Sequence, residues 1–98
     1  MKHVLHYHSQ TEDQLSEIML WYEEQQSGLG TSFLDEFDQT IKHICDFPEA
    51  VEVRRKKYRV VKIGKFPYVI VFELNKKSIE IYSITHTSRH PGKRFKWR

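Results

Sequence analysis

The sequence has little of what other classes of protein depend on. A single cysteine, Cys45, among 98 residues excludes an internal disulfide and a zinc site built from cysteine clusters. No apolar run approaches the ~18 residues of a membrane-spanning helix, and the N-terminus lacks the pattern of a signal peptide. With neither repeat nor low-complexity linker, residues 1–98 are expected to form one domain located in the cytoplasm.

Basic side chains are scarce in the first half of the chain and acidic ones in the second. Residues 1–50 hold two basic and ten acidic residues, a net charge of −8, whereas residues 51–98 hold fourteen and three, a net charge of +11. This separation predicts a basic surface for an anionic partner, either nucleic acid or an acidic protein segment. The structural alternative is that lysine and arginine protect exposed strand edges against aggregation.

The first half of the chain predicts one strand and two helices. Residues 3–8 are typical of a short strand, and residues 11–14, Thr-Glu-Asp-Gln, match the pattern of a capping box before an amphipathic helix. Residues 27–30 contain two of the four glycines and are predicted to end that helix. A hydroxyl residue, Thr31 or Ser32, is then expected to cap the second helix, which makes an antiparallel helical hairpin.

The second half of the chain predicts three strands in a meander, over residues 58–63, 68–74 and 79–84. The middle run is apolar on both faces, which is typical of a central strand covered on both sides. The expected order is therefore β-α-α-β-β-β. The fold class is α+β, with the helical hairpin packed on a mostly antiparallel sheet.

Short motifs that follow one another over most of the chain carry a resemblance to a known family. They are Trp21-Tyr22, Gly28-Leu29-Gly30 with Phe33, Phe47-Pro48, Tyr58-Arg59, Phe66-Pro67-Tyr68, Ile84-Thr85-His86 and Arg89-His90-Pro91 with Trp97. In this order the motifs resemble the RelE/ParE family, the toxins of bacterial type II toxin–antitoxin modules. The Gly-Leu-Gly turn, the Phe-Pro-Tyr segment and the His-x-x-Arg-x-Pro ending are closer to the ParE-like side.

The resemblance implies a small growth-inhibiting toxin, of the kind associated with plasmid stabilisation, that a cognate antitoxin neutralises. ParE-like members inhibit DNA gyrase, which is the function that the resemblance favours here. The alternative is a RelE-like endoribonuclease that cuts messenger RNA on the ribosome, and a second alternative is a non-toxic member that only binds its partner. No cofactor, metal or membrane is implied, and the assembly would be a homodimer or a toxin–antitoxin hetero-oligomer.

RNA cleavage by attack of the 2′-hydroxyl group needs a proton acceptor, a proton donor and cations on the scissile phosphate, and it needs no metal. The candidate catalytic residues for a RelE-like reaction are Arg59, His86 and Arg89, which could lie together across neighbouring strands. The structural alternative is that His86 closes a strand end and that both arginines pair with acids. Residues 93–98 lack the terminal Tyr or His-Tyr pair that the resemblance to RelE-like nucleases calls for, which favours the gyrase inhibitor.

Two segments, residues 54–59 and 93–98, interleave cations with aromatic side chains. This composition suits phosphate contact with base stacking, and it equally suits docking of an acidic antitoxin segment. The candidate binding residues are Arg54, Arg55, Lys57, Arg59, Lys62, Arg94 and Lys96. The structural alternatives are a solvated edge for the first segment and a tail whose Trp97 packs on the core for the second.

Other conspicuous residues predict structure more than chemistry. His6 and His8 share one face of the first strand, but without a cysteine or carboxylate nearby in the sequence no metal site is predicted. Cys45 is expected to be a small buried hydrophobic residue rather than a nucleophile. Trp21 and Tyr22 are predicted to pack in the core or within the hairpin.

Overall fold

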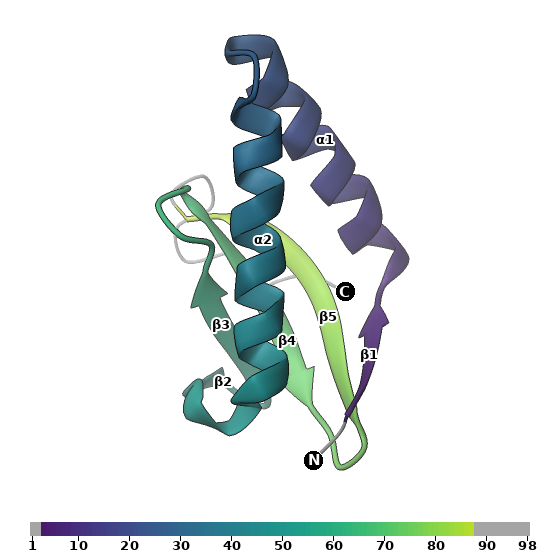
Figure 1. Cartoon of the computed structure of the whole chain (residues 1–98). Helices are drawn as coiled ribbons and strands as arrows, with labels where there is room; N and C mark the ends of the chain where they lie inside the picture. Colours follow the sequence, from purple (N-terminus) through teal and green to yellow (C-terminus); the bar gives the residue numbers. More distant parts are fainter. Residues whose placement is uncertain (1–2, 88–98) are drawn as a thin grey trace.

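The computed structural model describes residues 3–87. Its elements are β1 (Val4–Tyr7), α1 (Ser9–Gln25), α2 (Leu29–Asp46), the short 3-10 helix η1 (Pro48–Ala50), β2 (Val53–Arg55), β3 (Tyr58–Lys62), β4 (Tyr68–Leu74) and β5 (Ser78–His86). The two helices lie on one side of the sheet (Figure 1). The predicted α+β fold is confirmed, with the three-residue strand β2 in addition. All three residues of β2 are exposed, so they lack the apolar alternation by which a strand is predicted.

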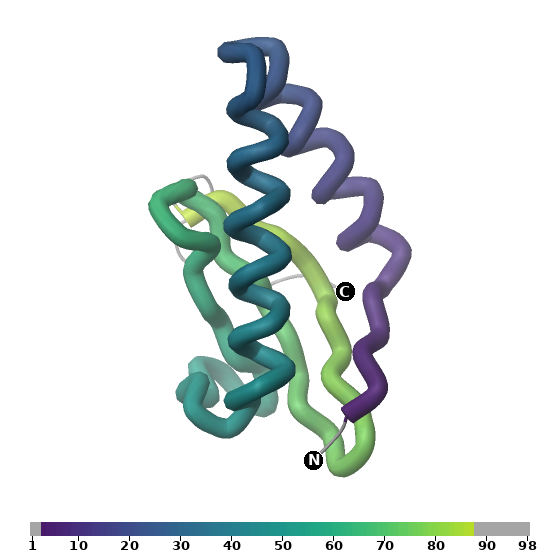
Figure 2. The backbone as a smooth tube through the Cα atoms, in the orientation of Figure 1, coloured from purple at the N-terminus to yellow at the C-terminus, as the bar shows by residue number. Residues whose placement is uncertain are grey.

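The sheet has the strand order β1-β5-β4-β3-β2. Strands β2 to β5 pair with one another antiparallel, whereas β1 pairs in parallel with β5. Figure 2 shows the chain leaving β1 into the helical hairpin and returning through the meander to lie beside its own start. The first strand, β1, is therefore an edge strand of the sheet, and the last described strand, β5, lies next to it.

The main hydrophobic core lies between α2 and the sheet. Phe33, Phe37, Ile41 and Ile44 of α2 are buried, and they meet Ile70 and Phe72 of β4 and the isoleucines of β5 in one cluster. In contrast, Thr11 is the only fully buried residue of α1, and the apolar stripe of that helix is only half-buried. Helix α1 thus covers the sheet incompletely, which leaves room along its inner side.

Helix α1 begins at Ser9 with His8 at the N-cap position, so the predicted capping box is wrong. Thr11 lies inside the first turn and is 1% exposed. Its hydroxyl group donates a hydrogen bond to the carbonyl oxygen of Ile81 at 3.1 Å. A tertiary bond to β5 takes the place of the local cap, because the buried hydroxyl group of Thr11 needs a partner.

Two further polar side chains of α1 fix the helix to β5. The side-chain amide group of Gln10 donates to the carbonyl oxygen of Tyr82 at 2.7 Å. The side-chain oxygen of Gln14 accepts a hydrogen bond from the Ile84 N–H at 2.7 Å. Tyr82 is an extra residue of β5 relative to β4, at a register shift in the pairing. The two glutamines therefore bond backbone groups at and beside a β-bulge.

Helix α2 begins at Leu29, earlier than the predicted cap at residues 31–32. Its first N–H groups are satisfied from α1 instead, because the Glu23 carboxylate accepts from the N–H groups of Gly28 and Gly30, both at 2.9 Å. Gly28 has a φ of 89°, which glycine tolerates. A Cβ atom on Gly30 would lie 2.6 Å from a backbone carbonyl oxygen of α1, so glycine permits the close approach of the two helices. None of the helices in the described range is both long and apolar enough to cross a membrane.

Candidate functional site

The predicted basic surface lies along β2 and β3, at the edge of the sheet away from β1 (Figure 1). Arg54 and Arg55 are exposed on the edge strand. The Lys57 ammonium group lies 3.6 Å from a carboxylate oxygen of Glu73, and the Lys62 ammonium group donates to a turn carbonyl at 2.8 Å. The structure therefore gathers four of the predicted binding residues at this edge. Two more of them, Arg94 and Lys96, lie beyond the described residues.

Arg59 points away from this surface, toward the side of the sheet that the helices cover. Its partner across the β3–β4 ladder is the core residue Phe72. Its Nη1 donates to the carbonyl oxygen of Val51 at 2.5 Å, and its buried Nε has no hydrogen-bond partner among the described residues. Arg59 thus holds the segment between η1 and β2, through a carbonyl group rather than an acid.

The structure does not bring Arg59 and His86 into one site. Arg59 lies opposite Phe72, whereas His86 lies opposite Tyr68, and the two strands flank β4 on either side. Four residues along a strand correspond to about 14 Å, and the sheet adds two strand spacings across. The expectation that these candidates lie side by side is therefore wrong. Arg89, the third candidate, lies outside the described residues.

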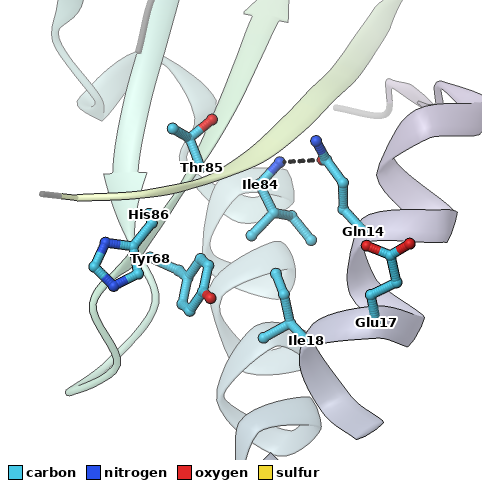
Figure 3. Close-up of a pocket in the computed structure, with 7 residues that line it drawn as sticks. All are labelled: Gln14, Glu17, Ile18, Tyr68, Ile84, Thr85 and His86. Atoms are coloured by element: carbon cyan, nitrogen blue, oxygen red, sulfur yellow. Dashed lines mark hydrogen bonds between the residues drawn. The ribbon is translucent and has the colours of Figure 1, made fainter. Parts of the chain in front are cut away.

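A groove separates α1 from the ends of β4 and β5 (Figure 3). It consists of two adjoining cavities of about 250 and 490 Å³. Both are lined by Glu17 and Ile18 of α1, by Tyr68 at the start of β4 and by His86 at the end of β5. Gln14 closes one end through its bond to β5, and Trp21 lines the other. The groove exists because the apolar stripe of α1 is only half-buried here.

Aromatic rings form much of the wall of this groove. The His86 ring lies 5.0 Å from the Tyr68 ring, and Tyr22 packs on Phe33 with ring centres 5.5 Å apart. Burial and then the nearby Tyr68 raise the pKa of the Tyr22 phenol, so it is a neutral hydrogen-bonding group at physiological pH. Tyr22 packs against the core as predicted. Of the two positions predicted for Trp21, the core is wrong, because Trp21 is 55% exposed; its ring packs on that of Tyr22, with centres 5.2 Å apart.

The sequence did not single out Glu17 and Tyr68 as residues of a common site. Glu17 is an ordinary exposed acid in the helical pattern, and Tyr68 is one residue of an apolar strand. Only the order β1-β5-β4 places the start of β4 next to the end of β5 and under α1. The one usable signal was the Phe-Pro-Tyr segment that ends in Tyr68.

On the other face of the sheet, Glu80 binds His6 of β1 and His8, the N-cap residue of α1. Its two carboxylate oxygens accept from His6 Nδ1 and His8 Nε2, each at 3.2 Å, and Ser78 donates to it at 3.0 Å. Burial alone would raise the pKa of Glu80, but these hydrogen bonds and the charge of His6 outweigh burial and lower it. Within residues 3–87 no group of three or more histidine, cysteine, aspartate or glutamate side chains is placed to hold a metal ion.

The neighbouring carboxylate, Glu73, lies directly opposite Glu80 in the β4–β5 ladder. Two like charges in this position repel each other, and each has its own partners. The Tyr82 hydroxyl group donates to Glu73 at 2.5 Å, and burial, followed by this bond, raises the pKa of Tyr82 well above its usual range. Tyr82 is therefore a fixed donor in this network.

Cys45 shows the opposite of nucleophile activation. Burial, with a smaller contribution from the neighbouring Asp46 carboxylate, raises the pKa of its thiol group. The thiol is partly buried at the edge of the core cluster. The neutral form is thus favoured, in keeping with a small apolar residue.

Comparison with known proteins gives a family and a fold. Residues 5–91 match the model of the ParE toxin of the type II toxin–antitoxin system parDE. The chain is similar in structure to the chromosomal ParDE toxin–antitoxin system of P. aeruginosa, with a TM-score of 0.77 and 14% identity over 89% of this chain and 98% of that chain. It is also similar to the E. coli DinJ–YafQ toxin–antitoxin complex, with a TM-score of 0.61 and 10% identity over 88% of this chain and 93% of that chain. None of the curated proteins matches the sequence.

Proposed function

Because the chain belongs to the ParE family of toxins from type II toxin–antitoxin systems, we propose that it inhibits bacterial growth by acting on DNA gyrase in the cytoplasm. A cognate antitoxin would neutralise it, in keeping with the toxin–antitoxin complexes among its structural neighbours. The inhibitor acts in this proposal by binding and carries out no chemical step.

The separation of Arg59 from His86 is the observation that carries the choice of gyrase over RNA. A ribonuclease of the RelE-like kind needs its cation and its proton-transferring groups around one phosphate. Here Arg59 bonds the Val51 carbonyl group on the helix-covered side, and His86 packs on Tyr68 at the far end of β4. Such an arrangement supports binding more than catalysis.

The basic edge of the sheet supplies the surface for an acidic antitoxin segment in this proposal. Arg54 and Arg55 are exposed on a short edge strand, so they approach a partner without first breaking internal contacts. Complementary charge of this kind contributes mainly to the rate of association and to specificity. We therefore expect Arg54→Glu with Arg55→Glu to slow antitoxin association strongly, and we expect the effect to shrink at high salt.

Pulse labelling in cells tests the proposal. After tightly controlled induction of the chain, incorporation of labelled thymidine should fall before incorporation of labelled amino acids. Single variants Arg59→Ala and His86→Ala that remain folded should still inhibit growth, because neither residue performs chemistry. An early collapse of protein synthesis, abolished by either variant, would instead establish the ribosome-dependent ribonuclease. If neither synthesis falls, the chain is a family member that only binds its partner.

A further inference from the structure

The groove between α1 and the ends of β4 and β5 combines one carboxylate with several aromatic rings. Its larger cavity, about 490 Å³, is lined by Glu17, Trp21, Tyr22 and Tyr68, together with Ile18, Pro67 and His86. In Figure 3 the Tyr68 ring extends from the sheet toward α1, which carries Glu17 and Ile18 on the opposite wall. Carboxylates and aromatic faces attract the same kind of ligand, an organic cation.

We propose that this groove binds an arginine side chain of a partner polypeptide. The Glu17 carboxylate accepts hydrogen bonds from the guanidinium group, and the exposed ring of Trp21 offers it a face for stacking. The hydroxyl group of Tyr68 is a further acceptor on the opposite wall. Because a guanidinium group is planar and weakly hydrated, it enters such a half-buried site at less cost than an ammonium group.

Charge complementarity distinguishes this occupant from the other candidates. An anionic ligand would meet Glu17 and, along the same helix, the exposed carboxylates of Asp13 and Glu24. A purely apolar segment would cover the Glu17 carboxylate without giving it a partner, and an unpaired buried charge is costly. A cationic side chain neutralises Glu17 and uses the aromatic surface at the same time. His86, which also lines the groove, is the one basic residue among the lining residues.

The predicted preference is for the charge of arginine and not only for its shape. A cation–π contact together with a charge-assisted hydrogen bond at a half-exposed site favours the cation by roughly tenfold over a neutral isostere. Citrulline is that isostere, since it replaces one guanidinium nitrogen by oxygen and removes the positive charge. The inference does not depend on which target the chain inhibits, because it concerns binding by the chain alone.

The test is a titration of the purified full chain with two blocked peptides, acetyl-Leu-Arg-Leu-amide and acetyl-Leu-citrulline-Leu-amide. Binding is followed by the NMR signals of the Trp21 indole group, identified with Trp21→Phe, and of the backbone amides of residues 14–22. We expect the arginine peptide to bind about tenfold more tightly than the citrulline peptide. In Glu17→Gln this advantage should fall to within about twofold, whereas in Glu12→Gln, a matched change at an exposed position of α1 that does not line the groove, it should persist.

Three results would overturn the proposal. Equal affinity for the two peptides would show that the groove takes apolar segments without regard to charge. No response of these signals to either peptide would show that the groove is closed to an added segment, for instance by residues of the chain itself. An undiminished arginine preference in Glu17→Gln would place the cation site elsewhere. Failure of gyrase inhibition, by contrast, would leave all of these measurements unchanged.

Discussion

The bond between Gln14 and the backbone of β5 offers a sharp test of how α1 is held. In Gln14→Ala the Ile84 N–H loses its partner at 2.7 Å. Ile84 is 4% exposed, so water replaces the lost acceptor poorly, and an unsatisfied buried donor costs about 1–3 kcal/mol. The higher helix propensity of alanine offsets roughly 0.3 kcal/mol. The free energy of unfolding should therefore fall by about 1–2 kcal/mol, which for a chain of this size lowers the Tm by about 5–15 °C.

Urea unfolding followed by circular dichroism measures this effect. The midpoint should move to lower urea with an unchanged slope, because the change in surface exposed on unfolding is nearly the same in both proteins. Gln39→Ala is the matched control, since it removes the same side chain from an exposed position of α2, and it should change the free energy by no more than about 0.5 kcal/mol. If Gln14→Ala and Gln39→Ala unfold at the same urea concentration, the assigned role of Gln14 is refuted.

Three other perturbations test separate parts of the structure. Gly30→Ala should lower the free energy of unfolding by at least about 1 kcal/mol, because its Cβ atom would lie 2.6 Å from a carbonyl oxygen of α1. A Tm equal to or above that of the wild-type chain would contradict this close approach. The lowered pKa of Glu80 means that its stabilisation is present above the unfolded-state pKa and is lost as the pH falls through the folded-state pKa. Unfolding between pH 6 and pH 2 should therefore depend less on pH in Glu80→Gln, and identical pH profiles would show that its bonds contribute nothing. Arg59→Ala should leave the Val51 carbonyl group without its donor and increase hydrogen exchange in β2, whereas unchanged exchange would remove its structural role.

The helices and strands could be predicted from the sequence wherever apolar residues follow the spacing of a helix or form the continuous run of a central strand. Phe33, Phe37, Ile41 and Ile44 follow the helical spacing and are the core face of α2. The apolar run of β4 marks the central strand, whose Ile70 is fully buried. These predictions are confirmed because local periodicity and burial agree there.

Tertiary hydrogen bonds explain one prediction that did not hold, the capping box, and one contact that was not predicted. Thr11 has the sequence context of a cap, but the carbonyl group of Ile81 lies within reach only once α1 packs on β5. Glu80 lies far along the chain from His6 and His8, and the parallel pairing of β1 with β5 brings them together. The local sequence carries no signal for either contact.

The candidate site was the least predictable part for the same reason. Residue types were enough to predict that the cations of residues 54–57 lie at an exposed edge, because an exposed strand places charged side chains in solvent regardless of partner. The distance between Arg59 and His86, in contrast, depends on the order of β3, β4 and β5 and on their register. The groove depends in addition on the angle at which α1 crosses the sheet, which only packing determines.

A gyrase supercoiling assay with the purified chain tests the central claim most directly. Relaxed plasmid, gyrase and ATP are incubated with increasing amounts of the wild-type chain or of His86→Ala, and the supercoiled product is measured. The account predicts inhibition by both proteins at similar concentrations, with release of inhibition when the cognate antitoxin is added. Full supercoiling in the presence of folded chain, together with cleavage of messenger RNA on translating ribosomes, would contradict it.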